Sequence, residues 1–232
     1  YDVLSKVVQG NGSTGTSVVL ITPDAERTMN THLGMCREYN VKDIDEELLM
    51  SSSFLYFTGY MWDTDSQKKA IQKAVDIAQS NNLKICFDVA DPFVVERNRE
   101  EFYEFIKSSV DIVFANQPEL NILFQSQDIN QSIDKLMNIV KCGGVKLGKN
   151  GSIVFNNLEK NKIEPKLIYA KDTTGAGDMY AAGFLSQFFK TNDYIASGKV
   201  GSALAEEIIQ INGAQFDKNM MSQIRSKIFQ IC

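Results

Sequence analysis

Histidine and cysteine, the side chains that most zinc sites use, are scarce in this chain of 232 residues. His32 is the only histidine, and the four cysteines form no CxxC pair. Zinc sites combine several such ligands at short spacing, so the sequence argues against a zinc site. Isolated cysteines in a chain of this length are typical of a reducing compartment, and we therefore expect a cytoplasmic protein. The cysteines are Cys36, Cys86, Cys142 and Cys232.

Long apolar runs and an excess of positive charge are also lacking. The sequence contains no apolar stretch of about 18 residues and no visible signal peptide, so we expect no membrane span. The formal net charge is -5 at pH 7, whereas nucleic-acid-binding proteins usually carry a basic face. With 44% hydrophobic residues the chain can bury a core. This composition is ordinary for an enzyme, and we therefore expect neither nucleic-acid nor membrane partners.

Strand and helix patterns alternate along most of the chain. Residues 17–22 and 27–33 predict a hairpin of two strands. Alternation further along is typical of an α/β fold with a mostly parallel sheet and helices on both faces. We expect residues 34–232 to form this core, and residues 1–33 to supply a partial β lid and its connection. Core strands are expected at 54–60, 83–89, 111–117, 145–148, 152–155 and 167–170, and helices at 65–81, 98–108, 118–124, 130–141, 176–189, 193–211 and 217–230.

Two glycine clusters are candidates for a phosphate-binding loop. Residues 10–15 (GNGSTG) match the GxGxxG pattern of dinucleotide-binding loops, but they precede an expected strand. A dinucleotide loop follows a strand and opens a helix, so we interpret this cluster as a polar connection. Residues 172–178 (DTTGAGD) follow the expected strand 167–170 and open an apolar helix. The second cluster therefore has the context that a phosphate-binding loop requires.

The start of the expected helix at residue 176 favours an anion. Glycines at 175 and 177 allow close approach of a ligand to the backbone, and free N–H groups with the helix dipole favour negative charge. Asp178 has two interpretations here. It is either a carboxylate that stabilises the helix start, or a general base that takes a proton from an attacking hydroxyl. The glycine pair favours the second, because a capping acid needs no glycine beside it.

The segment DTTGAGDMYAAGFL (172–185) resembles the C-terminal signature of the ribokinase-like, or PfkB, family of carbohydrate and nucleoside kinases. Three other segments resemble family motifs in the same order: NQPE (116–119), VKLGKNG (145–151) and SALAEEIIQINGA (202–214). The segments 14–34, 57–64 and 88–116 look most like the adenosine kinase branch. The resemblance implies a three-layer ribokinase-like fold. It also implies ATP-dependent transfer of a phosphoryl group to a hydroxymethyl group of an adenosine-like nucleoside.

The resemblance also implies roles for individual residues. Asp178 matches the base, and Gly175, Ala176 and Gly177 match the anion hole. Asn116 and Glu119 match the pair that organises Mg²⁺, partly through water. ATP-binding positions are matched by Asn116, Lys146, Gly148, Gly151 and Gly177, and a possible K⁺ site by Asp172 and Thr174. Two alternatives stay open: a sugar kinase with a ribose- or fructose-like acceptor, and a nucleotide-binding protein of the same fold without catalysis.

The acceptor-binding residues are the least defined part of this prediction. Family members usually carry an upstream segment with an Asp and a glycine pair that hold acceptor hydroxyls. Neither is present before Thr14, so we expect the N-terminal part to be missing. Arg27, Asp88 and Phe93 are weaker acceptor candidates, each with an ordinary structural interpretation as well. The apolar alternation of the lid is compatible with a monomer or a homodimer.

Overall fold

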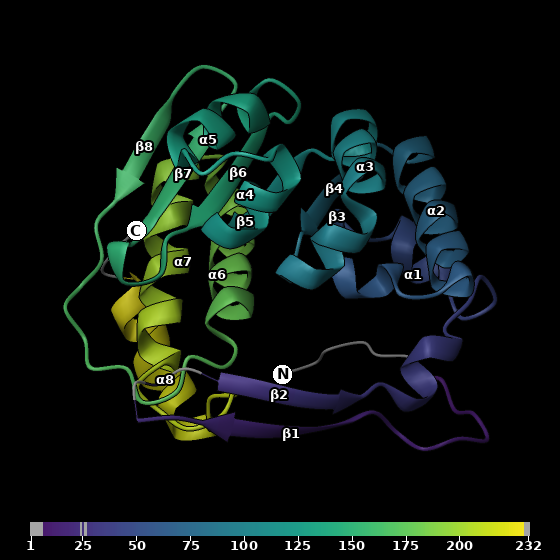
Figure 1. Cartoon of the computed structure of the whole chain (residues 1–232), viewed down its shortest axis with the longest axis horizontal. Coiled ribbons are helices and arrows are strands. Elements are labelled where there is room, and N and C mark those ends of the chain that lie inside the picture. Colours follow the sequence, from purple (N-terminus) through teal and green to yellow (C-terminus); the bar gives the residue numbers. More distant parts are fainter. Residues whose placement is uncertain (1–6, 24, 26, 230–232) are drawn as a thin grey trace.

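The computed structural model describes residues 7–23, 25 and 27–229, which form two separate sheets with surrounding helices. A two-stranded hairpin lies apart from the body of the protein, along one side of it (Figure 1). The hairpin consists of β1 (Thr16–Ile21) and β2 (Arg27–His32). The main sheet has six strands in sequence order. They are β3 (Phe54–Thr58), β4 (Lys84–Asp88), β5 (Ile112–Asn116), β6 (Cys142–Lys146), β7 (Ser152–Asn156) and β8 (Lys160–Ile163).

The main sheet is parallel on one side and antiparallel on the other. Strands β3 to β6 pair in parallel, and β7 and β8 continue the sheet in antiparallel register. Lys146 of β6 pairs with Ser152 of β7 across a short 3₁₀ turn, η3 (Gly148–Asn150), so the strands expected at 145–148 and 152–155 form a hairpin. The parallel strands place their carboxyl ends at one common edge, where ligands of α/β proteins collect.

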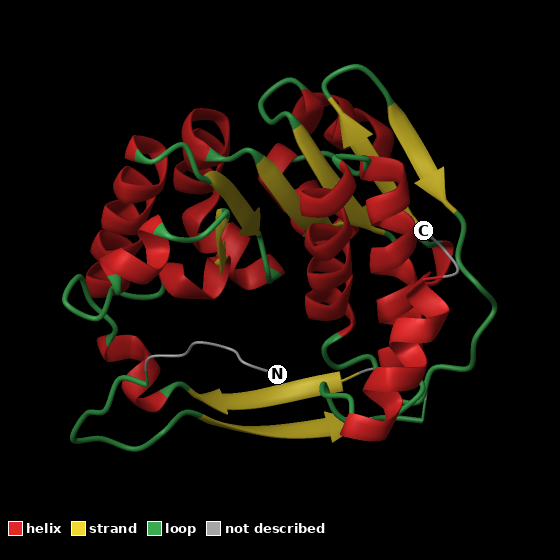
Figure 2. Ribbon diagram, turned by 180° about the vertical axis from the view of Figure 1, so that it is seen from behind, coloured by secondary structure: helices red, strands yellow, loops and turns green. Residues whose placement is uncertain are grey.

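Helices cover both faces of the sheet, as Figure 2 shows from behind. In β5, Val113 and Ala115 belong to the hydrophobic core on one face, and Ile112 and Phe114 to the core on the other. Successive side chains of a strand point to opposite faces, so this continuous apolar run fills both cores. The helices are α1 (Glu46–Met50), α2 (Asp65–Ser80), α3 (Pro92–Ser109), α4 (Gln117–Phe124), α5 (Ile129–Met137), α6 (Ala176–Thr191), α7 (Tyr194–Ile208) and α8 (Lys218–Phe229).

The two cores contain different helices. The first includes buried side chains of α2, α3, α4 and α5, among them Val75, Phe102 and Leu120. The second is formed largely by α6, whose Tyr180 and Phe184 pack beneath the sheet. The three-layer expectation is therefore confirmed. No helix among the described residues is long and apolar enough to cross a lipid bilayer.

The lid hairpin is exposed along most of both strands and is attached to the body at both ends. At its tip, the Thr173 hydroxyl donates to the carbonyl of Ala25 at 3.0 Å. At its base, the short helix η1 (Gly34–Glu38) accepts hydrogen bonds from the start of α2, where Gln67 Nε2 donates to the carbonyl of Cys36 at 3.0 Å. The hairpin thus spans the side of the body where α6 begins (Figure 1).

One expected strand is wrong. Residues 167–170 are not a strand, and Leu167 and Tyr169 are exposed by 104% and 83%. An apolar segment forms a strand only where a neighbouring strand offers hydrogen bonds. Here the chain runs along the surface as irregular backbone. The helix expected at 98–108 begins earlier, at Pro92 of α3, behind an Asp91 cap. The strand β8 had no counterpart among the expectations.

Candidate active site

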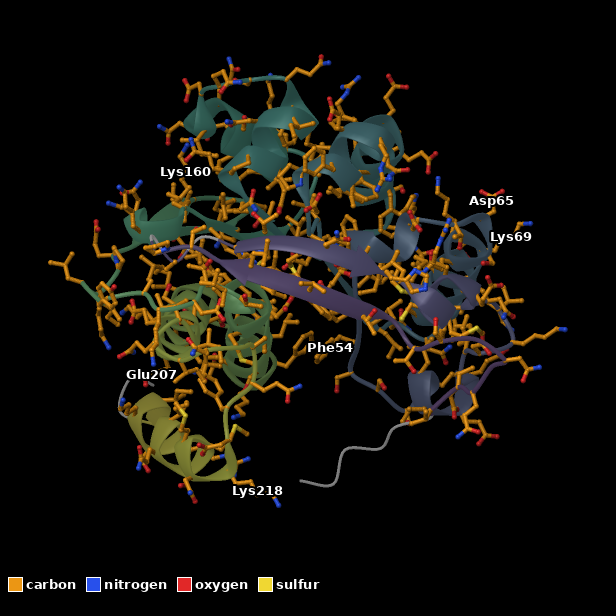
Figure 3. All side chains as sticks on the ribbon, turned by 60° about the horizontal axis from the view of Figure 1, so that its bottom comes forward. Phe54, Asp65, Lys69, Lys160, Glu207 and Lys218 are labelled. Carbon is orange, nitrogen blue, oxygen red and sulfur yellow. The ribbon has the colours of Figure 1, made fainter. Side chains whose placement is uncertain are left out.

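Four elements bring polar side chains together at the carboxyl edge of the parallel strands. Asp88 ends β4, Asn116 ends β5 and Lys146 ends β6, while the first turn of α6 supplies Asp178. Most sequence-predicted residues therefore converge at one place. Figure 3 looks at the molecule from the lid side, where the hairpin crosses in front of this region.

The N-terminus of α6 is open. Gly175 precedes the helix with a φ of 79° and no side-chain cap, and Ala214 packs behind it. Glycine reaches this left-handed conformation without the strain that a Cβ would add. Within the described residues, the backbone N–H groups of Gly177 and Asp178 have no hydrogen-bond acceptor in the protein. Such a turn offers two donors and the positive end of a helix dipole to an anion.

The Asp178 carboxylate is likewise unoccupied by protein partners. No hydrogen bond or ion pair joins it to any of the described side chains, and it lines a cavity of about 440 Å³. Burial raises its pKa, as does the nearby charge of Asp88, while Lys146 and Arg27 act in the opposite direction. A raised pKa suits a general base, which must accept a proton. The other lining residues are Phe54, Tyr56, Thr58, Ala182, Leu185 and Ser186.

Lys146 is the central positive charge of the site. Its Nζ donates to both carboxylate oxygens of Asp88, at 2.9 and 3.1 Å. Burial by itself lowers the pKa of Lys146, but the carboxylates of Asp88, Glu119 and Asp178 outweigh burial and raise it overall. A Cβ added at Gly177 would lie 3.3 Å from this Nζ. Glycine at 177 thus leaves room for the ammonium group beside the open helix turn.

Asn116 and Glu119 form a reciprocal capping box at the start of α4. Asn116 Oδ1 accepts from the Glu119 N–H at 2.9 Å, and Glu119 Oε2 accepts from the Asn116 N–H at 2.8 Å. Glu119 is only 1% exposed, and burial, together with the charges of Asp88 and Asp91, raises its pKa to about 7. The pair has a structural role in this helix start, and its predicted role near Mg²⁺ remains a prediction.

The side-chain oxygens of Asn116 and Glu119 at this edge fit a magnesium ion whose other ligands are water and substrate phosphate. Among the residues that the structure describes, no three His, Cys, Asp or Glu side chains converge as a metal cage. Mg²⁺ keeps several waters and is bound by one or two carboxylates together with substrate phosphates, so a full protein cage is not required. Glu119 also lies near the like charges of Asp88 and Asp91, which a dication would offset.

The remaining predicted positions flank this centre. Gly148 and Gly151 have φ values of 57° and 83° in the turn between β6 and β7, and nothing lies within 4 Å of a Cβ added at Gly148. The Asp172 carboxylate accepts from the N–H groups of Thr174 at 2.8 Å and Gly213 at 2.7 Å. Asp172 therefore holds the loop before α6, and the K⁺ role of Asp172 and Thr174 remains a prediction.

The weaker acceptor candidates have separate environments. Arg27 of the lid donates to Thr173 Oγ1 at 3.2 Å, and its charge is close enough to α6 to offset part of the rise in the pKa of Asp178. Asp88 is 3% exposed and paired with Lys146, so it does not face an acceptor freely. Phe93 is 74% exposed at the start of α3 and lines neither the cavity at Asp178 nor the hollow at the base of the lid.

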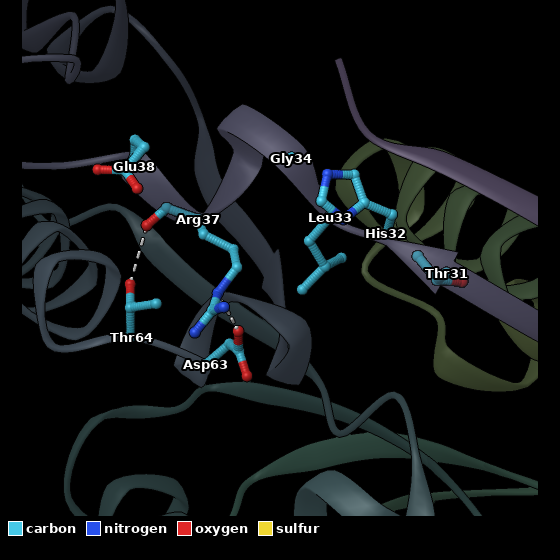
Figure 4. A pocket seen from close by; sticks show the side chains of 8 residues that line it. All are labelled: Thr31, His32, Leu33, Gly34, Arg37, Glu38, Asp63 and Thr64. Carbon is cyan, nitrogen blue, oxygen red and sulfur yellow. Dashed lines mark hydrogen bonds and ion pairs between the residues drawn. The ribbon is translucent and has the colours of Figure 1, made fainter. Parts of the chain in front are cut away.

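A second hollow, of about 590 Å³, lies away from Asp178 at the base of the lid (Figure 4). Arg37 points across it to Asp63, with Nε 3.0 Å from Oδ2, and Thr64 donates to the carbonyl of Arg37 at 3.1 Å. These contacts join η1 to the start of α2. His32 also lines this groove.

Three aromatic and hydroxyl residues near Asp178 were not expected from the sequence. Tyr56 and Thr58 of β3 line the same cavity as Asp178, and the pKa of Tyr56 is raised first by burial and then by Asp88 and Asp178. Tyr60 is 51% exposed, and burial of its hydroxyl together with Asp91 and Glu119 raises its pKa to about 12. The only available signal was their position at the carboxyl end of an expected strand.

Comparison with known proteins agrees with this geometry. The profile of the pfkB family carbohydrate kinases matches residues 2–220. The chain belongs to this family. An uncharacterized sugar kinase from Archaeoglobus fulgidus is 23% identical over 215 residues, which cover 90% of this pfkB family chain and 82% of the relative. A 5-dehydro-2-deoxygluconokinase from Clostridium botulinum is 24% identical and covers 82% of this chain.

Solved structures give the same fold. The crystal structure of an adenosine kinase from Sinorhizobium meliloti superposes with a TM-score of 0.88 at 34% identity, covering 92% of this chain. This pfkB family chain spans 66% of that adenosine kinase and 59% of the Clostridium relative. The ribokinase-like fold expected from the sequence is therefore confirmed.

Proposed function

We propose that the protein transfers the γ-phosphoryl group of ATP to a hydroxymethyl group of an adenosine-like nucleoside. The observation that carries the proposal is the first turn of α6. There the Asp178 carboxylate has no partner among the described residues, and the adjacent N–H groups of Gly177 and Asp178 have no acceptor. A free base beside free donors is the arrangement that phosphoryl transfer to an alcohol requires.

In the proposed reaction, Asp178 accepts the proton of the acceptor hydroxyl as its oxygen bonds to the γ-phosphorus. The bond between the γ-phosphorus and the β–γ bridging oxygen breaks, and ADP leaves with that electron pair. The amides of Gly177 and Asp178 and the Lys146 ammonium stabilise the charge on the transferred oxygens. The raised pKa of Asp178 supports its proton-accepting role.

Magnesium is part of this proposal. When bound, it would neutralise phosphate charge, and Asn116 and Glu119 would hold it, partly through water. Glu119 is buried beside like charges, so it is poised to be ionised by a nearby dication. We also propose that Asp172 and Thr174 serve as the K⁺ site, and that ATP lies along Lys146, Gly148 and Gly151.

The aromatic rings near Asp178 favour a nucleoside over a bare sugar. The cavity at Asp178 includes the rings of Phe54 and Tyr56, and Tyr60 exposes its ring at the same sheet edge. A flat base gains from stacking on aromatic rings, whereas a bare sugar needs a ring of polar partners. The adenosine kinase from Sinorhizobium meliloti is 34% identical to this chain and a probable sugar kinase from Rhizobium etli is 31% identical, so sequence identity does not separate the two acceptors. A sugar acceptor stays the alternative, because the sequence relatives include sugar kinases.

The acceptor is tested by following ADP formation with MgATP and, in parallel, adenosine, inosine, ribose and fructose. We expect the highest kcat/KM for adenosine, and a thermal shift with adenosine that ribose does not produce. A higher kcat/KM for ribose or fructose would establish the sugar kinase instead. Binding of MgATP with no transfer to any acceptor would favour a nucleotide-binding protein without catalysis.

A further inference from the structure

Asp88 is the buried carboxylate of the site for which the proposed mechanism has no role. Its side chain is 4% exposed, compared with 18% for Lys146, and the two form a pair with contacts of 2.9 and 3.1 Å. Buried charges of this kind are held in place because losing either partner leaves the other uncompensated. Two hydrogen bonds to both carboxylate oxygens also fix the direction of the ammonium group.

The pair bridges strands that are not neighbours. Asp88 of β4 is level with Phe114 of β5, which is level with Gly144 of β6, so Lys146 lies beyond Asp88 along the strand direction. The lysine side chain therefore reaches back across the end of β5 to meet Asp88. Its Nζ remains beside the first turn of α6, where a Cβ at Gly177 would lie 3.3 Å away. One ammonium group thus contacts Asp88 and lies beside Gly177 at the same time.

The backbone after β4 is shaped to hold the carboxylate. Ala90 has a φ of 80°, a left-handed conformation that alanine seldom adopts, and its N–H donates to Asp88 Oδ1 at 3.2 Å. Val89 donates to the carbonyl of Phe114 at 2.9 Å, which ties the same turn to β5. Strained backbone at a ligand-binding edge is a recurring sign of a position under functional constraint.

Lys146 has two other carboxylates within electrostatic range, Glu119 and Asp178. A lysine free to move would pair with Asp178 and so occupy the base. With Asp88 as its partner, Lys146 keeps its charge near the anion cradle, and Asp178 stays without an ion pair among the described residues.

We propose that Asp88 is a positioning residue that orients the Lys146 ammonium toward the phosphoryl group and away from Asp178. This inference rests on the proposed phosphoryl transfer and adds to it a residue that acts only through Lys146. It also reassigns Asp88, which the sequence placed among the acceptor candidates.

The test is a double-mutant cycle of Asp88→Asn and Lys146→Met, with MgATP and adenosine as substrates. Asp88→Asn should lower kcat/KM for ATP roughly 10- to 100-fold, because the donors to the transferred group are misplaced. In the Lys146→Met background the same substitution should change kcat/KM by less than about three-fold, because its target is gone. If the loss of kcat/KM in the double variant equals the product of the losses in the two single variants, the proposal is overturned.

Asp111→Asn is the matched control. Asp111 is also a partly buried acid between lysines, with Lys84 Nζ at 3.3 Å and Lys141 Nζ at 3.4 Å, but it lies at the opposite edge of the sheet, just before β5. Its substitution should leave kcat/KM within about two-fold. If Asp88 has a purely structural role, Asp88→Asn and Asp111→Asn should both lower the thermal stability and leave the kinetics of the folded protein unchanged. This result would also overturn the proposal.

A measurement on the unaltered protein covers the case in which Asp88→Asn does not fold. A crystal structure with Mg²⁺ and the non-hydrolysable analogue AMP-PNP should show Lys146 Nζ bonded to Asp88 and to a phosphate oxygen together. A Lys146 that turns to Asp178 would reject the role of Asp88. If the unaltered protein binds no MgATP, or Asp178→Asn keeps full turnover, the proposed function itself fails. A working enzyme with a silent Asp88→Asn rejects the positioning role alone.

Discussion

The helices α4 and α6 begin at the same edge of the sheet, yet their first turns differ. At α4, Asn116 and Glu119 satisfy each other's backbone N–H groups, so the helix start is closed by its own side chains. At α6, a glycine in the left-handed conformation replaces the cap, and two N–H groups are left without an acceptor among the described residues. A closed start stabilises the fold, whereas an open start can bind an anion.

The acids of the two turns differ in the same way. Glu119 is 1% exposed and uses its oxygens within the protein, while Asp178 borders a cavity and has no hydrogen-bond or ion-pair partner in the described part of the chain. The comparison indicates that a carboxylate in the first turn of a helix is a catalytic candidate only when the turn does not need it as a cap.

The largest expected effect tests this difference directly. Asp178→Asn should lower kcat about 1,000-fold, because the amide cannot accept the proton, while the Kd for MgATP changes by less than about three-fold. Asp193→Asn is the control, because Asp193 caps α7 through the N–H groups of Ile195 and Ala196 at 2.9 and 3.0 Å. Steady-state kinetics and calorimetry measure both variants. Equal turnover in the two variants would make Asp178 an ordinary helix-start acid.

The stability of the folded protein should depend on pH through Glu119, in the closed first turn of α4. Burial raises the folded-state pKa of Glu119 from 4.5 to about 7, so the folded protein holds this proton more tightly than the unfolded chain. The resulting stability is present below pH 4.5 and is lost as the pH rises through about 7. Without metal, the unaltered protein should lose on the order of 3 kcal/mol relative to Glu119→Gln between pH 4.5 and 8.

Urea unfolding of both proteins across this pH range measures that difference. Glu119→Gln keeps the size of the side chain and one acceptor oxygen for the Asn116 N–H, whereas the contact of Asn116 Nδ2 with Oε1 is lost at every pH. A stability difference that does not change with pH would show that Glu119 has the same pKa in the folded and unfolded states.

Gly175→Ala should strain the first turn of α6 and so destabilise the folded protein. The φ of 79° disfavours any Cβ, and the added atom would come within 2.7 Å of Ala214 Cβ. We expect a loss of about 1–3 kcal/mol in the free energy of unfolding. Gly148→Ala is the control for strain alone, because Gly148 has a φ of 57° with nothing within 4 Å of an added Cβ. Equal losses in the two variants would show that Ala214 does not constrain the turn.

The smallest effect concerns the lid. Thr173→Val removes the hydroxyl that donates to the Ala25 carbonyl at 3.0 Å and accepts from Arg27 at 3.2 Å. These contacts join the hairpin to the loop before α6, and their loss should cost about 0.5–1.5 kcal/mol of local stability. Amide hydrogen exchange in β1 and β2 should become faster, whereas Thr191→Val, at the far end of α6, should leave it unchanged. Unchanged exchange in Thr173→Val would mean that the hairpin is held elsewhere.

Much of the core was predictable, because its signals are local. The continuous apolar run of β5 and the helical spacing of apolar residues in α2 each show from the sequence which side chains are buried. The glycines and Asp178 of the site were predictable for the same reason, since loop and helix start are adjacent in the sequence. The strand expected at 167–170 failed, because pairing depends on a neighbour that local pattern does not specify.

Long-range contacts account for the rest. Nothing in the sequence connects Asp88 with Lys146, which lie 58 positions apart and meet across an intervening strand. Tyr56 and Thr58 were interpreted only as strand residues, and their place beside Asp178 depends on how β3 packs next to α6. The capping box of Asn116 and Glu119 was visible as a spacing, but a capping pair and a metal-organising pair share that spacing.

Nuclear magnetic resonance of the backbone amides offers the most direct test of the open turn. On addition of MgADP with aluminium fluoride, a mimic of the transferred phosphoryl group, the ¹⁵N–¹H signals of Gly177 and Asp178 should shift most. The signal of Ile195 N–H, already bonded to Asp193 Oδ1 at 2.9 Å in the capped start of α7, should move far less. Undisturbed Gly177 and Asp178 signals, with the main changes at another place such as the groove beside Arg37, would contradict a phosphoryl site at the start of α6.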